Sequence, residues 1–393
     1  MGNKGHIRRK TSIFRIFLIP LITIMLIQSI ITIGTLIVRK TAGMLQGYSS
    51  SMMERMVENR RVILQNDMNQ RWASVNEKEV LFNDVLNRFL DDRHMDVDEF
   101  LDSDKMKSDF LNQVFPECLN MQQNSSATGI FVILTGADIE TAGDYDGFFI
   151  RDSDPDTSPA NYTDLLLERG SKELSREWNI PLDTCWTTRF HMDGQGQNDA
   201  DDFFYEPWKA GAEYPEIDTD ILGYWALPFS LEKEMEDSYQ MITYSIPLRY
   251  EGQVYGVLGV EISDRRFSDY FPVTELNDSQ QSGYMLAVRQ NDGSYMPLVG
   301  KGILYHLVCS LENTFVLRET NYDHLSLVEG VKLDDQKIYT VICPIKLYSN
   351  NVPYENTEWV LLGLNTEEEL FGMSRQLYFW MMAAVMAGLA FGV

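Results

Sequence analysis

Residues 240–248, QMITYSIPL, and residues 254–262, VYGVLGVEI, are two short runs rich in β-branched and aromatic side chains. Such runs favour β-strands, because these side chains pack well on a pleated surface. Arg249–Gln253 lies between them and contains Gly252, and a short connection with a glycine is typical of a β-hairpin. The two runs therefore predict a pair of neighbouring antiparallel strands.

Similar runs occur on both sides of this pair. Gly129–Thr135 and Phe148–Arg151 precede it, and Asn161–Trp178 predicts a helix whose cap is Asn161 or Thr163. A second β-rich group follows it, with runs at 283–289, 295–299, 337–347 and 358–364 and an Asn-Asp-Gly turn at 291–293. We predict an α+β fold with two successive modules of strands and helices.

The residues before these strands predict a long helix. Between residues 48 and 128 there is no glycine, and Pro116 is the only proline. Apolar side chains recur there at spacings of three, four and seven, which indicates one helical face; they are Leu64, Met68, Trp72, Val75, Phe82, Leu86 and Phe89. A helix over Met44–Leu90 would be about 70 Å long. Asp96–Leu119 predicts one or two shorter helices that end near Pro116.

Two uncharged segments predict contact with a membrane. Ile16–Val38 has 23 residues without a charge, enough for a helix to cross a hydrocarbon core of about 30 Å. A cleaved signal peptide is the alternative, but its apolar region has only about 7–15 residues, and here Arg39 and Lys40 follow directly. We therefore favour a transmembrane helix over residues 16–38.

The second uncharged segment is Leu377–Val393, which has Tyr378, Phe379 and Trp380 at its start. Aromatic side chains are enriched where a helix meets the membrane surface. The segment is at the lower limit of the roughly 17–25 residues that a span needs. We interpret it as the truncated start of a second transmembrane helix; a buried C-terminal helix is the alternative.

The charge distribution predicts an orientation and excludes one class of partner. Residues 1–40 contain seven of the 33 basic residues and no acidic one, which leaves 26 basic and all 58 acidic residues for the remainder. A body with a net charge of −32 would be repelled by nucleic acid. Five basic residues precede the first span and only Arg39 and Lys40 follow it. The positive-inside rule thus predicts residues 1–15 in the cytoplasm and 41–376 outside the plasma membrane.

Five motifs, in this order between the two spans, resemble the double Cache sensor domains of bacterial transmembrane receptors. They are Gly147–Pro155, Phe204–Ala210, Gly223–Pro228, Ile242–Leu248 and Val254–Ser263. The resemblance covers residues 41–376. It implies stalk and connecting helices at 41–123, a membrane-distal module at 124–272 and a membrane-proximal module at 273–376. Each module would have a PAS-like antiparallel sheet.

The same resemblance implies a function. Receptors of this family usually bind a small molecule in the membrane-distal module. We expect a homodimer, because a parallel pair of stalk helices gives a piston or rotation of the membrane spans something to act against. Whole receptors of this family carry a histidine kinase, diguanylate cyclase or chemotaxis-signalling domain in the cytoplasm. The branch that binds amino acids has an Arg two residues before a Trp-Tyr pair, whereas here Arg189 is followed by Phe190 and His191, and Trp208 has no such Arg. An amino-acid ligand does not follow from the resemblance.

The predicted ligand pocket lies in the segment 186–244, which is rich in aromatic residues. Aromatic walls with a few polar groups are typical of small-molecule pockets. The alternative is that these aromatic side chains belong to the core. The candidate ligand-binding residues are Trp186, Arg189, Tyr205, Trp208, Tyr224, Trp225 and Tyr244; among them, Arg189 is able to pair with a carboxylate.

Other chemistry finds little support in the sequence. There is no GxSxG, HExxH, Walker-type or GxGxxG motif, so we predict no enzyme activity, cofactor or metal site. The acidic run 199–202 is a weak cation candidate, with a solvated loop as the alternative. A membrane-tethered hydrolase and an adhesion or structural ectodomain remain alternative functions. Four widely spaced cysteines (Cys118, Cys185, Cys309 and Cys343) are compatible with one or two disulfides or with free thiols.

Overall fold

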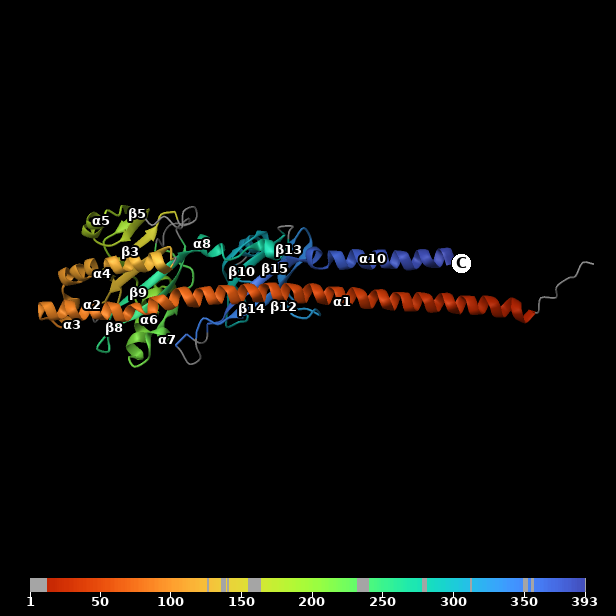
Figure 1. Ribbon diagram of the computed structural model, residues 1–393, viewed down its shortest axis with the longest axis horizontal. Helices are drawn as coiled ribbons and strands as arrows, with labels where there is room; N and C mark the ends of the chain where they lie inside the picture. The colour runs from red at the N-terminus through yellow and green to blue at the C-terminus, as the bar shows by residue number, and fades with distance from the viewer. Residues whose placement is uncertain are drawn as a thin grey trace, which may run out of the picture.

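The structure is a computed structural model that describes residues 13–125, 127–135, 139, 141–154, 164–231, 240–277, 281–311, 313–348, 353–354 and 357–392. It is elongated, with the helix α1 (Ile13–Asn76) running along most of its length (Figure 1). Two β-sheets lie along the second half of α1, and the C-terminal helix α10 (Glu367–Gly392) lies beside its first half. The predicted α+β fold is confirmed.

The predicted long helix is present, with a one-residue interruption. α1 ends at Asn76 and α2 (Lys78–Arg93) starts after Glu77. The apolar face predicted for this helix is buried at Leu64, Met68, Val75, Phe82, Leu86 and Phe89; the side chain of Trp72 lies outside the described residues. This face packs against both sheets in one continuous apolar cluster.

Two more helices connect the stalk to the first sheet. α3 (Val97–Asp102) starts with a capping box, in which the Asp96 carboxylate accepts a hydrogen bond of 2.8 Å from the Glu99 N–H. α4 (Asp104–Ser125) continues through Pro116, so the predicted helix end near Pro116 was wrong. Buried side chains on both sides of this proline, Phe115 and Cys118, hold the helix in place, and this packing outweighs the backbone hydrogen bond that proline removes.

The first sheet has the strand order β5-β4-β3-β1-β9-β8-β7. Its strands are β1 (Gly129–Leu134), β3 (Gly147–Asp152), β4 (Leu165–Arg169), β5 (Leu182–Thr187), β7 (Tyr224–Trp225), β8 (Met241–Tyr250) and β9 (Gln253–Ser263). The predicted hairpin is β8 and β9, and its turn residues Glu251 and Gly252 both have positive φ, as a type I′ turn requires. One prediction was wrong: the sheet is not wholly antiparallel, because β5 pairs with β4 in parallel.

The helix predicted over 161–178 is also wrong in its first half. Residues 161–163, which include the predicted caps, lie outside the described residues, and 165–169 form the strand β4. Only α5 (Lys172–Trp178) is helical, with Ser171 as its cap. A short leucine run does not distinguish a buried strand from a helix. Gly170, with φ of 131°, separates the two elements in a conformation that favours glycine.

The two faces of the first sheet pack against different layers. Ile242, Tyr244 and Ile246 of β8 point to the face that packs against the long helices, here called the stalk-side face. Met241 points to the opposite, outer face. The outer face is covered by the ribbon of β2 (Gly143–Tyr145) and β6 (Phe190–Met192), by η1 (Asp199–Asp201), α6 (Asp202–Glu213) and α7 (Thr219–Leu222).

The second sheet is antiparallel throughout, with the order β11-β10-β15-β14-β13-β12. Its strands are β10 (Ser282–Arg289), β11 (Tyr295–Lys301), β12 (Leu317–Glu319), β13 (Ser326–Leu333), β14 (Gln336–Ile345) and β15 (Trp359–Thr366). Two short elements, α8 (Asp264–Ser268) and η2 (Val273–Glu275), connect the sheets, and α9 (Ile303–Leu311) packs on the second sheet. β15 ends at Thr366 and α10 begins at the next residue, so the sheet continues directly into the C-terminal helix.

The apolar part of α1 is mostly exposed. Among the described residues, α1 is the one helix that is long and apolar enough to cross a membrane, by length and composition. α10 lies against this part of α1, where a Cβ placed on Gly34 would be 3.2 Å from Cγ1 of Val385. The second span, at residues 377–393, stays a prediction. All four cysteines are free thiols, and Cys118 and Cys343 are buried.

Candidate ligand site on the outer face of the first sheet

An aromatic layer fills the space between the outer face of the first sheet and its cover. The rings of Phe131 on β1 and Phe203 on α6 meet edge to face at 5.1 Å. Phe203 also stacks on Phe229 at 4.7 Å. Tyr205 is buried in the same layer, and Trp208 packs against it from α6. This layer supplies the aromatic walls that small-molecule pockets use.

Four polar side-chain atoms in this region are buried without a hydrogen-bond partner among the described residues: Oγ1 of Thr243, Oγ of Ser245, Nε1 of Trp208 and the hydroxyl oxygen of Tyr205. Thr243 and Ser245 alternate with the stalk-side residues of β8, so both hydroxyls point to the outer face. α6, which carries Trp208, packs across β8. An unpaired buried polar group costs about 1–3 kcal/mol, so a folded chain retains such a group where something else binds it.

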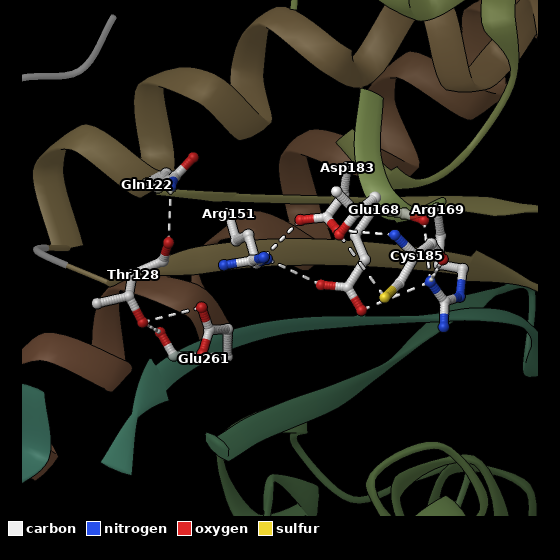
Figure 2. A network of polar contacts seen from close by, with 9 residues as sticks. Gln122, Thr128, Arg151, Glu168, Arg169, Asp183, Cys185 and Glu261 are labelled. Atoms are coloured by element: carbon white, nitrogen blue, oxygen red, sulfur yellow. Dashed lines mark hydrogen bonds and ion pairs between the residues drawn. The ribbon is translucent and has the colours of Figure 1, made fainter. Parts of the chain in front are cut away.

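Glu261 adds a buried carboxylate to the same face. It lies on β9 directly opposite Thr243 and is fully buried. The Thr128 hydroxyl donates a hydrogen bond of 2.9 Å to its Oε1 (Figure 2). A Cβ on the neighbouring Gly129 would lie 2.6 Å from the same oxygen, so the absence of a side chain there makes room for the carboxylate. The outer face thus combines two hydroxyls with a buried acid.

A second polar network lies on the same sheet, toward β4 and β5 (Figure 2). Nε of Arg151 is 3.0 Å from Oε2 of Glu168, and the same guanidinium also pairs with Asp183. Burial raises the pKa of Asp183, but the Cys185 N–H and the charge of Arg151 outweigh burial, so the pKa is below its usual value. The charge of Arg151 is therefore engaged by two carboxylates of the protein.

The start of α6 is acidic. Burial, together with the nearby charges of Glu206, Asp199 and Asp201, raises the pKa of Asp202 to about 7. Burial also raises the pKa of Glu206. A carboxyl whose pKa is about 7 is protonated in part at neutral pH. A cation at this end of the site would favour its ionised form.

The structure brings together three of the seven predicted ligand-binding residues. Tyr205, Trp208 and Tyr224 all pack in the aromatic layer of the outer face. Trp225 and Tyr244 lie on the stalk-side face, with their rings 5.1 Å apart, and the Tyr244 hydroxyl donates a hydrogen bond of 2.8 Å to Oδ1 of Asn76. These two residues connect the first sheet to the stalk.

Trp186 and Arg189 lie elsewhere. Nε1 of Trp186 donates a hydrogen bond of 3.1 Å to the Gly170 carbonyl, and its ring packs on the stalk-side cluster. Arg189 is 2.7 Å from both Asp146 and Asp104, and the hydrogen bond with Asp104 contributes most to raising its pKa. Its guanidinium connects the covering ribbon to α4, rather than facing the aromatic layer.

Sequence reasoning missed Thr243, Ser245 and Glu261. A signal for them was present, since each is a polar residue with apolar or aromatic neighbours on both sides in its strand. In a strand buried on both faces, a polar side chain needs a partner. The sequence did not indicate which elements cover that face.

A groove of about 880 Å³ lies in another part of the molecule, between α1 and the second sheet. Glu54 and Glu58 of α1 line one side, and the β12–β13 turn with Asp323 and His324 lines the other. Nδ1 of His324 is 3.0 Å from Oε1 of Glu54 across the groove. Among the described residues, no three His, Cys, Asp or Glu side chains converge as metal ligands.

The sequence matches no protein-family model and no curated protein. Solved structures that are similar include a methyl-accepting chemotaxis protein X, at 11% identity and a TM-score of 0.42, over 81% of this chain and 98% of that one. The ligand-binding domain of the Pseudomonas fluorescens chemoreceptor CtaA, in complex with L-leucine, has 12% identity and a TM-score of 0.36, over 81% and 97%. The extracellular domain of a protein described as a histidine kinase has 12% identity and a TM-score of 0.36, over 82% and 98%.

Proposed function

We propose that this chain is the extracytoplasmic small-molecule sensing module of a transmembrane signalling receptor, and that its ligand binds between α6 and β8. The observation that carries the proposal is the set of four buried polar atoms without partners among the described residues, on Tyr205, Trp208, Thr243 and Ser245. A ligand that hydrogen-bonds to them would satisfy groups that are otherwise costly to bury. In this proposal the chain binds the ligand, and a cytoplasmic domain of the receptor provides the signalling output.

The charges favour a ligand with an amine over one with a carboxylate. The ionisable side chains on this face and on its cover include the buried Glu261 and the acidic start of α6, with Asp202 and Glu206. The two arginines that a carboxylate would need, Arg151 and Arg189, each pair with two carboxylates of the protein. A small primary amine therefore matches the site, since it offers N–H donors to hydroxyls and a charge that a carboxylate stabilises.

The test uses the full chain in detergent, with thermal unfolding measured in small primary amines and in carboxylic acids of the same size. We expect an amine at about 100 times its Kd to stabilise the parent protein by about 2.7 kcal/mol. The double variant Thr243→Val, Ser245→Ala should lose this stabilisation. It should nevertheless be at least as stable as the parent without ligand, because it removes two unpaired buried hydroxyls.

The control variant is Thr340→Val in the second sheet. Thr340 is equally buried, but its hydroxyl donates a hydrogen bond of 3.2 Å to the Val341 carbonyl. This variant should be less stable than the parent and keep the full response to the amine. An unchanged response in the double variant would remove β8 from the site, and a response to acids alone would contradict the charge argument.

We also propose that the receptor is a homodimer in the plasma membrane, with residues 41–376 outside, and that the stalk helices pair along one exposed face. Met44, Tyr48, Met52 and Ile63 are exposed apolar residues of α1 beyond its most apolar part. At about 100° per residue they fall on one side of the helix. Arg55 and Asn59 lie on the same side, between Met52 and Ile63. A mostly apolar stripe on an extended helix is typical of a helix–helix contact.

Disulfide formation in membranes tests the dimer. Tyr48→Cys should give a covalent dimer on mild oxidation, because two stripes that face each other bring the two thiols together. Gln46→Cys is the control, since residue 46 lies at nearly the same height on the other side of α1. Equal yields from the two variants would argue against pairing through this stripe.

A further inference from the structure

The connection between β14 and β15 of the second sheet reaches the first sheet. Two of its described residues, Tyr348 and Tyr354, pack in a small cluster with Leu222 of α7, Ala210 of α6 and Tyr224 of β7. We call Tyr348 and Tyr354 the tyrosine clasp.

The tyrosine clasp contacts β7 through both rings and main chain. The Trp225 N–H donates a hydrogen bond of 3.0 Å to the Tyr348 hydroxyl. The ring of Tyr354 lies 4.9 Å from that of Tyr224 and 5.3 Å from that of Tyr348. Burial raises the pKa of both clasp hydroxyls, so both remain protonated at neutral pH and serve as donors.

The tyrosine clasp also binds the main chain of α6. The Tyr354 hydroxyl donates a hydrogen bond of 2.9 Å to the carbonyl of Glu206. Glu206 lies between Tyr205 and Trp208 on the helix that covers the proposed ligand site. A change in the position of α6 would therefore act directly on Tyr354, which is itself buried.

The other end of this connection leads to the membrane. Tyr354 is five residues before Trp359, the start of β15, and β15 continues without a linker into α10. We propose that the tyrosine clasp couples the state of the α6–β8 site to the position of α10 beside α1. The inference rests on the proposed function, because that function supplies the ligand binding that would change the α6–β8 site. The mechanical link between α6 and α10 is a separate claim. It requires that the connecting segment has two arrangements, and that both the α6–β8 site and α10 favour one of them over the other.

The position of α10 is measured by a cysteine pair, and no ligand is needed. Gly34→Cys with Val385→Cys places two thiols where α1 and α10 touch, since a Cβ on residue 34 lies 3.2 Å from Val385. The disulfide formation rate of this pair, in the full chain in membranes, reports the contact. Trp208→Ala perturbs the proposed site, and Tyr354→Phe removes one hydroxyl from the clasp while keeping its ring.

We expect Trp208→Ala to change the disulfide rate about fivefold or more, the lower end of usual coupling between sites. In the Tyr354→Phe background the same substitution should change the rate less than about twofold. Tyr295→Phe, a second-sheet tyrosine whose ring stacks on Phe315, is the control and should leave the response intact. Thermal unfolding checks that each variant is folded.

An equal response with and without the Tyr354 hydroxyl would overturn the tyrosine clasp as the route. The absence of any response to Trp208→Ala would overturn coupling between α6 and α10. Failure of the amines to bind would instead overturn the proposed ligand, because the disulfide measurement uses none. The two proposals therefore fail on different results.

Discussion

Arg151→Met is expected to lower the free energy of unfolding by about 3–5 kcal/mol at neutral pH, the usual effect of removing one partner from a buried ion pair. The substitution keeps much of the side-chain volume and leaves two carboxylates, on Glu168 and Asp183, without their shared cation. Both carboxylates are buried. Chemical denaturation of parent and variant at several pH values measures the effect.

The effect should depend on pH, with a sign that follows from the pKa of Asp183. In the parent this pKa is below its usual value, so the ion pair stabilises the fold at neutral pH and is lost as the pH falls through that pKa. In the variant the ionised carboxylates destabilise the fold, and acid relieves this by protonating them. The difference between the two proteins should therefore shrink toward about pH 4.

Arg289→Met provides the comparison on the surface. Arg289 is 3.3 Å from Glu358, and both side chains are about half exposed. Exposed pairs contribute about 0–1 kcal/mol, so this variant should be nearly as stable as the parent. A loss of only that size for Arg151→Met would show that the buried network contributes no more than a surface pair.

Gly363→Ala is expected to destabilise the contact between the stalk and the second sheet by about 3 kcal/mol, the upper part of the range for overpacking. A Cβ on residue 363 would lie 2.3 Å from Cγ2 of Val57 on α1. Val57 is fully buried, so it has no free space to move into. Denaturant unfolding gives the loss of stability.

A compensating substitution identifies the cause. Val57→Ala removes the methyl group that would clash, and alone it leaves a cavity with its own cost. The double variant should be more stable than the sum of the two single effects predicts, by about 0.5–3 kcal/mol, as expected for residues in contact. Additive effects would mean that residue 363 acts on something other than Val57.

Much of the fold could be predicted because its main elements carry strong local signals. The long helix follows from eighty residues almost without helix breakers, and its buried face was identified from spacing alone. The β8–β9 hairpin follows from two β-rich runs around Gly252. In contrast, the leucines at 165–167 form a strand because β3 and β5 flank them, and both of these strands lie outside the local sequence window that suggested a helix.

The candidate site was harder to predict for a related reason. Alternation along β8 separates Thr243 from Tyr244, but it does not say which set faces α6 and which faces the stalk. The prediction was based on aromatic residues, and two of them, Trp225 and Tyr244, pack on the stalk-side face instead. The residues that give the outer face its polarity are small or singly placed, and their importance is visible only once the cover is known.

Because α1 is one uninterrupted helix, it fixes the rotation of the two sheets relative to the apolar first half of the helix. One residue added to α1 before Val57 would turn everything beyond it by about 100° and shift it by about 1.5 Å. For a residue added between Gly34 and Val57, Val57 would keep its contact with Gly363, but Gly34 would no longer face Val385 of α10, because the two contacts lie on opposite sides of the added residue. Seven residues, close to two turns, would restore the facing to within about 20°. The stalk can therefore change length in evolution or by design only in steps of roughly whole turns.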